Sequence, residues 1–456
     1  MQFRFHSIMY PLLFLAIFCA NSFLFQQPLV GGILLVTHLV WMGHRLGSVR
    51  TPNADITARL WTGIWIFLSG VMIVGSVAYY IASVPRILFQ SIVILSILLS
   101  FALPPTPSPS LFFHLKRMVS QGRKNVSVPL LLAAGSILVF LGVFLRFVGA
   151  NAITAAIRTP FDQITPAFLL LFVGASALVF LLLYRGREKT LSLFLFCALI
   201  GTLFSFLAIA YPIGYGFDPF IHKATEAHLA EFGTITPKPF YYIGQYSIVL
   251  FFSHAFSLPI DAVDTWLVPL LAAILLPLAW FGATNILLKK PRYALLPLVG
   301  LFLLPLETFT VTTPQGLANL WILLAVLSSV PWLFDEEEPD WFLSGLVTCA
   351  TILIHPIAGI PLFFFFTLLF FSKHRTRLPS QVTTIIRNVL LVGGSLALPA
   401  SFALQSFKSG QGIHLTLANL NPIPFLQSMN LGVLIQSRFK TLFVFCFLFG
   451  QNKFVI

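Results

Sequence analysis

Long uninterrupted apolar runs are the feature that most limits what this chain can fold into. Runs such as 168–183 and 267–288 contain no charged residue and approach the length that crosses about 30 Å of hydrocarbon as a helix. A strand of a membrane barrel would instead alternate apolar and polar residues, so only helices satisfy the backbone of these runs in lipid. With 58% hydrophobic and 9% charged residues among 456, and a mean hydropathy of +0.93, the sequence predicts an all-α, polytopic integral membrane protein.

Hydropathy predicts about thirteen transmembrane helices and one further helix that does not span. The predicted spans are 8–25, 29–43, 61–83, 87–103, 128–148, 167–184, 190–211, 263–288, 293–309, 314–334, 341–356, 357–371 and 383–404. We divide the chain into an N-terminal six-span region (1–189), a membrane core (190–404) with an outer loop (212–262), and residues 405–456. That last part is expected to be an outer loop and the start of a further, truncated span.

The basic residues indicate how the chain is oriented. The net charge is +13, but Lys and Arg occur in short clusters between apolar runs, which is typical of the positive-inside rule and not of nucleic-acid binding. With the N-terminus inside, the clusters around Arg50 and Lys189 fall on the cytoplasmic side and Asp218 falls on the outer face. We therefore expect a multi-pass plasma-membrane protein whose functional residues face outward.

Two segments leave a choice of topology. More Lys and Arg reach the inner side if the helix at 241–258 lies along the outer surface, and its mixture of polar and aromatic residues predicts one wet and one apolar side. The pair of helices at 341–371 is short for two crossings. It forms either a tight turn at His355 between thin, tilted helices or a re-entrant segment packed against protein.

The polar stretch 214–242 carries the candidate functional residues. Asp218 followed by Pro219 predicts a helix N-cap, and Gly233 predicts the helix end, which gives a helix over about 219–232. His222 and Glu226 then lie one and two turns beyond Asp218, so all three can share one face. The same stripe is equally typical of a solvated helix face.

The order of segments resembles the GT-C superfamily of membrane glycosyltransferases, which use polyprenyl-phosphate sugars. The resemblance rests on YPIGYGFDPFIHKATEAHLAEFGTI (211–235) after a span, followed by TPKPFYYIGQYSIVL (236–250), and then a span after Asp264. TTPQGLANLWILL (312–324) and LIHPIAGIPL (353–362) are similar to phrases in such proteins. The resemblance covers about 190–404. The related type within the superfamily is that of the dolichyl- or undecaprenyl-phosphate mannosyl- and aminoarabinose-transferases.

The resemblance implies a site and a reaction. Asp218 matches the acidic position and would be the catalytic base, and Lys238 with Pro239 looks like the lysine–proline element near the carrier phosphate. His222, Glu226 and His355 would be substrate-binding residues. The donor would be a polyprenyl-phosphate sugar, the acceptor an unidentified glycan, lipid or protein, and transfer would invert the anomeric carbon. The acid is not paired with a second one, so no metal ligand is assigned and a need for a divalent metal stays open.

Other interpretations of these residues remain. Lys238 can be an interfacial lysine whose stem lies along apolar surface, and His355 before Pro356 can be a turn residue. A transporter or flippase of lipid-linked saccharide would need ionisable residues inside the membrane, which the predicted spans nearly lack. A non-catalytic scaffold would tolerate Asp218→Ala, whereas the glycosyltransferase would not.

Overall fold

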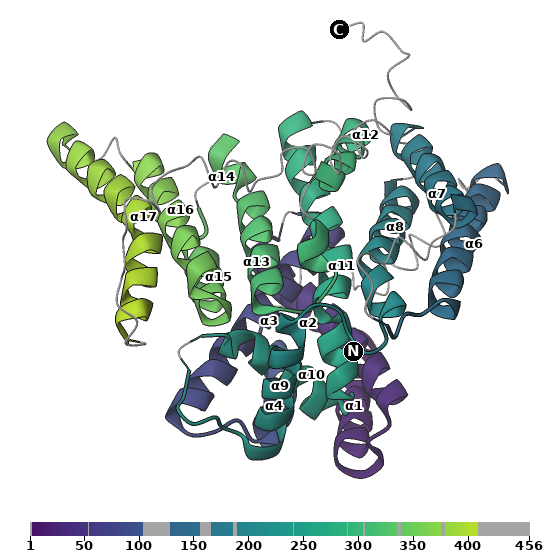
Figure 1. Cartoon of the computed structure of the whole chain (residues 1–456), viewed down its shortest axis with the longest axis horizontal. Helices are drawn as coiled ribbons and strands as arrows, with labels where there is room; N and C mark the ends of the chain where they lie inside the picture. Colours follow the sequence, from purple (N-terminus) through teal and green to yellow (C-terminus); the bar gives the residue numbers. More distant parts are fainter. Residues whose placement is uncertain are drawn as a thin grey trace, which may run out of the picture. The chain divides into compact units, whose positions relative to one another are not determined.

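A computed structural model describes residues 2–52, 54–103, 128–155, 166–185, 189–239, 241–289, 291–303, 306–334, 339–374 and 379–408. The chain divides into two units, 1–394 and 395–456, and the first contains every candidate site residue. Of the second unit, the structure describes 395–408, and the predicted outer loop and span after 409 lie outside the described residues. The described residues form helices and no strands, which confirms the all-α class (Figure 1).

The N-terminal region is built from six described helices and a π-helical turn. Their apolar surfaces are widely exposed, with Leu29 and Ile81 each 80% exposed, as suits side chains that face lipid. The elements are α1 (Gln2–Cys19), the π-helix η1 (Ala20–Phe25), α2 (Pro28–Arg50), α3 (Ile56–Ile81), α4 (Arg86–Ala102), α6 (Val128–Ala150) and α7 (Pro166–Arg185).

The other described helices follow in the chain, and among them α11 packs against α8 and α13 (Figure 1). They are α8 (Lys189–Ala210), α9 (Asp218–Phe232), α10 (Ile243–Phe256), α11 (Ile260–Leu288), α12 (Pro291–Ala294), α13 (Pro314–Ser328), α14 (Val330–Phe334), α15 (Trp341–Ile354), α16 (Pro356–His374) and α17 (Ser380–Lys408), with 3₁₀ turns η3 (Leu296–Leu303) and η4 (Leu306–Phe309).

Seven helices within the described ranges are long and apolar enough to cross a membrane. They are Pro28–Arg50, Ile56–Ile81, Leu130–Ala150, Lys189–Ala210, Ile260–Leu288, Pro314–Phe334 and Pro356–His374. Shorter apolar helices occupy the predicted spans 8–25, 87–103, 167–184 and 341–356, so the full set of thirteen stays a prediction. The prediction of a continuous α-helix over 293–309 is wrong: the described residues form α12 and then 3₁₀ turns, because Pro297 and Gly300 interrupt a continuous helix.

The predicted wet side of the helix at 241–258 is also wrong. Every residue of α10 except His254 is buried, because α2, α3, α4, α11 and α15 pack around it. Two of its polar side chains find partners inside the protein: Ser253 Oγ donates to the Leu258 carbonyl at 2.8 Å, and Gln245 Nε2 donates to Glu226 Oε1 at 3.0 Å. Residues on either side of the α3–α4 connection bond the segments at the two ends of α10. Tyr80 donates to the Pro239 carbonyl, and Arg86 donates to the His254 carbonyl. The placement of this helix outside the set of spans stays a prediction.

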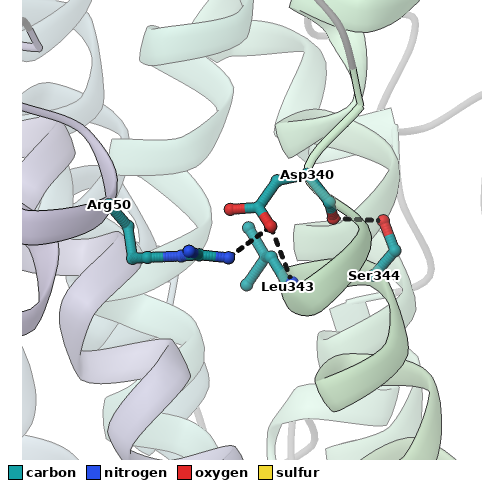
Figure 2. Close-up of polar contacts among 4 residues, drawn as sticks. All are labelled: Arg50, Asp340, Leu343 and Ser344. Atoms are coloured by element: carbon teal, nitrogen blue, oxygen red, sulfur yellow. Dashed lines mark hydrogen bonds and ion pairs between the residues drawn. The ribbon is translucent and has the colours of Figure 1, made fainter.

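Two ion pairs bring predicted inner loops together at one end of the helices. Arg50 at the end of α2 pairs with Asp340, whose side chain also accepts a hydrogen bond from the Leu343 amide at the start of α15 (Figure 2). Lys189 at the start of α8 lies 3.5 Å from Asp55, the N-cap of α3. We call Arg50, Asp55, Lys189 and Asp340 the ion-pair end. Their proximity agrees with the prediction that these loops share one side.

Candidate functional site

Helix α9 positions the first candidate residues. It ends where predicted, at Gly233, which has φ of 71° and donates its amide to the Leu229 carbonyl at 2.8 Å. Its start differs from the prediction, because Asp218 is the first helical residue and its side chain makes no capping hydrogen bond. Phe217 is already in helical conformation and its carbonyl accepts from Phe220, so the turn begins one residue earlier. The carboxylate of Asp218 is therefore not occupied as a cap.

The predicted stripe on α9 is divided between solvent and the protein interior. His222 and Glu226, one turn apart, are both buried on the inner face, together with Leu229. Asp218 is exposed, and no hydrogen bond or ion pair joins it to a residue that the structure describes. The shared face is thus confirmed for His222 and Glu226, and Asp218 lies at its solvent end.

His222 is held in an aromatic setting that also contains His355. Its Nδ1 lies 2.8 Å from the hydroxyl of Tyr246, and its ring centroid lies 5.1 Å from that of Tyr242. The ring of Tyr242 also lies 5.4 Å from that of His355, measured between centroids. Burial lowers the pKa of His222, an effect that the charge of Asp218 opposes and that His355 reinforces.

A close approach between α10 and α15 brings these residues together. A Cβ on Gly244 would lie 2.8 Å from the backbone nitrogen of Ile354, so only glycine lets the first turn of α10 contact the last turn of α15. His355 follows directly as the C-cap of α15 and is 7% exposed. α15 and α16 pack against each other and are joined by a tight turn at His355, which both of the arrangements that the sequence left open share.

Glu226 belongs to a second group, formed with residues that the sequence analysis did not select. Gln245 Nε2 donates to Glu226 Oε1 at 3.0 Å, and the carboxyl of Asp264 on α11 lies against that of Glu226. Glu226 and Gln245 are fully buried and Asp264 is 4% exposed. Burial, followed by the charge of Asp264, raises the pKa of Glu226 well above its ordinary value. We call Asp218, His222, Glu226, Asp264 and His355 the acid–histidine cluster.

A small pocket of about 50 Å³ opens beside this cluster. It lies between the end of α8, the start of α9, the start of α11 and the residues before α13, and it includes Lys223, Asp264 and Thr312 in its lining. Lys223 forms an ion pair with Asp261 at 3.1 Å. In this conformation the pocket has room for a few water molecules and not for a sugar.

Lys238 lies away from the cluster. Its ammonium donates to the carbonyls of Tyr79, Tyr80 and Ala82, at 2.7, 3.3 and 3.0 Å, where it satisfies the last turn of α3. It also lies 5.3 Å from the ring centroid of Tyr79. These contacts explain Lys238 as a helix C-terminal cation, and its predicted role at a carrier phosphate stays a prediction.

The residues that the sequence analysis missed have recognisable signals. Asp264 is an acid inside a long apolar helix, and Gln245 is an amide inside an apolar segment, both of which point to polar groups that need partners in the interior. Their pairing with Glu226 comes from three separate helices, which spacing along the chain does not reveal. Within the described ranges, no three His, Cys, Asp or Glu residues come together as a metal site.

Comparison with known proteins adds no assignment: no family model, curated protein or solved structure matches the chain.

Proposed function

We propose that the protein is a membrane glycosyltransferase that moves a sugar from a polyprenyl-phosphate carrier to an acceptor hydroxyl, with Asp218 as the general base. The observation that carries the proposal is an exposed carboxylate within an exposed apolar rim. Around Asp218, the exposed fractions of the large apolar side chains are 61% for Ile213, 41% for Tyr215, 77% for Phe217, 43% for Phe220 and 48% for Ile221.

Such a rim suits an amphiphilic substrate. Aromatic and apolar side chains at the end of a helical bundle favour the membrane–water interface, where a polyprenyl chain enters the bilayer and its phosphate sugar stays in water. Asp218 would therefore meet the sugar end of the carrier. The sequence resemblance in 190–404 supplies the substrate class, and the rim supplies a physical reason for it.

The reaction needs a proton acceptor and a cation. Asp218 would take the proton of the acceptor hydroxyl as its oxygen bonds to the anomeric carbon, while the bond from that carbon to the carrier phosphate breaks and leaves the phosphate with the electron pair. Lys223 is a cation in the pocket lining, five residues beyond Asp218 on α9, and would stabilise the leaving phosphate. His222 would act through Asp218, because burial leaves it neutral and turned inward.

The test is sugar transfer by the purified chain in lipid nanodiscs with a panel of radiolabelled polyprenyl-phosphate sugars. Asp218→Asn is compared with Glu231→Gln, which removes a similar charge from an exposed site on the same helix. We expect Asp218→Asn to lower kcat by about 100-fold or more and Glu231→Gln to leave it unchanged. Equal activity of Asp218→Asn and wild type, or no transfer from any donor by folded wild-type protein, would rule the proposal out.

A proton-coupled transporter is the second candidate, and the buried pair Glu226 and Asp264 favours it. Carboxyls buried among apolar helices are costly and are typical of proton or ion pathways. Uptake of lipid-linked or free saccharide into proteoliposomes under a pH gradient would distinguish the two. The transporter requires Glu226→Gln to block uptake and Asp218→Asn to spare it, whereas the glycosyltransferase predicts no uptake by either protein.

A further inference from the structure

The charges around Glu226 and Asp264 do not neutralise two carboxylates. Lys223 is the cation whose charge acts on both carboxyls, and it already pairs with Asp261. The groups that face the pair from the packed helices are His222 and Lys223 on α9, Gln245 and Tyr246 on α10, and Asp261 on α11. Two adjacent buried carboxylates with one shared cation would carry a large desolvation and repulsion cost.

The hydrogen bonds of the pair are also incomplete. The amide of Gln245 is the one donor that the described structure supplies, and it reaches Glu226 Oε1. Glu226 Oε2 and Asp264 Oδ1 are buried and have no hydrogen-bond partner among the described residues. A proton on one carboxyl would provide the missing donor and remove one of the two charges.

The pocket gives this pair access to exchangeable protons. Asp264 is part of its lining, and the volume of about 50 Å³ accommodates water. Glu226 is absent from the lining and fully buried, and Asp264 is the member of the pair that borders the pocket. A proton that enters or leaves the pair from the pocket must therefore pass through Asp264.

We propose that Glu226 and Asp264 share one proton and form a proton-exchange site, at which Asp264 takes a proton from, or returns it to, water or a hydroxyl bound in the pocket. The singly protonated pair carries one negative charge. When it accepts a proton from a bound hydroxyl or water, the pair becomes neutral and the donor oxygen keeps the electron pair. The doubly ionised state is disfavoured by burial, so exchange runs between the neutral and singly charged states. This site does not depend on glycosyl transfer or on Asp218.

Infrared spectroscopy of the carboxylic-acid carbonyl stretch tests the shared proton. At pH 8, where exposed carboxyls are ionised, wild-type protein in nanodiscs should show a carboxylic-acid band that persists in Glu231→Gln. The band should be lost in the isosteric double variant Glu226→Gln/Asp264→Asn. Absence of the band in wild type, or its persistence in the double variant, would overturn the proposal.

The route through the pocket has its own test. On transfer to D₂O, the band should shift within the mixing time, and Ala208→Phe, which places a ring in the pocket lining, should slow that shift. Val326→Phe, at an exposed apolar position on α13, is the control and should leave the rate unchanged. An unchanged rate in a folded Ala208→Phe protein would overturn exchange through the pocket. Thermal unfolding of each variant verifies that it is folded.

Discussion

The ion-pair end and the acid–histidine cluster differ in how their charged groups are exposed and paired. Arg50 and Asp340 are 33% and 27% exposed and bond each other, and Lys189 with Asp55 is similarly exposed. In the acid–histidine cluster, Glu226 and Asp264 are at most 4% exposed and retain buried oxygens without a partner among the described residues. Water therefore solvates the charges of the ion-pair end and is largely excluded from Glu226 and Asp264.

Buried charge is the better guide to function in this chain. Exposed ion pairs contribute at most about 1 kcal/mol, and their loss changes little. Buried ionisable groups cost free energy in the absence of partners, so a chain that is 9% charged and yet buries two acids and two histidines in one region is expected to use them. This contrast between exposed and buried charges should be measurable in stability as well as in activity.

The largest effect is expected at the contact that assembles the acid–histidine cluster. A Cβ on Gly244 would meet the backbone nitrogen of Ile354 at 2.8 Å, so Gly244→Ala should separate α10 from α15 and cost about 1–3 kcal/mol. Gly70→Ala is the control, because its Cβ would meet nothing within 4 Å and alanine favours a helix by up to about 1 kcal/mol. Unfolding by SDS in mixed micelles measures both. Equal stability of the two variants would refute the close-contact argument.

The next effect concerns the donor to Glu226. Gln245→Leu keeps the volume nearly constant and removes the amide that bonds Glu226 Oε1, so it should destabilise the protein by about 1–3 kcal/mol. Gln315→Leu, at an exposed position on α13, should change stability by less than about 0.5 kcal/mol. The same unfolding measurement applies. A stable Gln245→Leu protein would show that Glu226 does not depend on this bond.

The pH dependence of stability should also distinguish the cluster. Because the folded pKa of Glu226 is raised above its ordinary value of 4.5, the stability that its neutral form provides is complete below pH 4.5 and is lost as pH rises through the raised value. Wild-type protein should therefore lose stability relative to Glu226→Gln, which stays neutral, as pH rises above about 4.5. His222 and His355, whose lowered pKa acts in the opposite direction below about pH 6.5, are common to both proteins. Parallel stability curves would contradict the raised pKa.

Much of the fold follows from the sequence because hydropathy is a local property. The all-α class, the helix that ends at Gly233 and the turn at His355 could all be predicted from apolar runs and helix stop signals. The break in the helix at 293–309 could not be predicted in this way, because apolar composition alone does not account for the effect of Pro297 and Gly300 on the backbone. The prediction of a solvent-exposed side on α10 was wrong for a related reason. Gln245 and Ser253 are polar and indicated contact with water, but in the folded protein they bond to groups in the interior.

The candidate site was predictable only within one helix. The spacing of His222 and Glu226 indicates a shared face, and the structure has it. The contact of Glu226 with Asp264, and that of His222 and His355 through Tyr242, join helices that are distant in sequence. Lys238 illustrates the same limit, because the carbonyls that it bonds lie about 156 to 159 positions away. Tertiary packing decides which groups come into contact, and the periodicity of a single sequence does not reveal that packing.

A smaller effect on stability is expected at Lys238. Lys238→Met keeps the apolar stem and removes the ammonium that bonds the last turn of α3, which should cost about 0.3–1 kcal/mol. If this contact is the whole role of Lys238, KM for a polyprenyl-phosphate donor will be unchanged. Lys373→Met, at the last turn of α16, provides the comparison of a lysine at another helix end. A large rise in KM without a change in stability would restore the phosphate role that the sequence resemblance implies.

The smallest effect is expected at the ion-pair end, where two contributions can be separated. Asp340 both pairs with Arg50 and accepts the Leu343 amide at 3.0 Å as the N-cap of α15 (Figure 2). Asparagine caps helices as well as aspartate does, so Asp340→Asn removes the ion pair and keeps the cap, and should change stability by about 0–1 kcal/mol. Asp340→Ala loses both and should cost about 1 kcal/mol more. If Arg50→Gln and Asp340→Asn each destabilise as strongly as Gln245→Leu, the ion-pair end is not the solvated region that its exposure indicates, and burial no longer distinguishes the two ends.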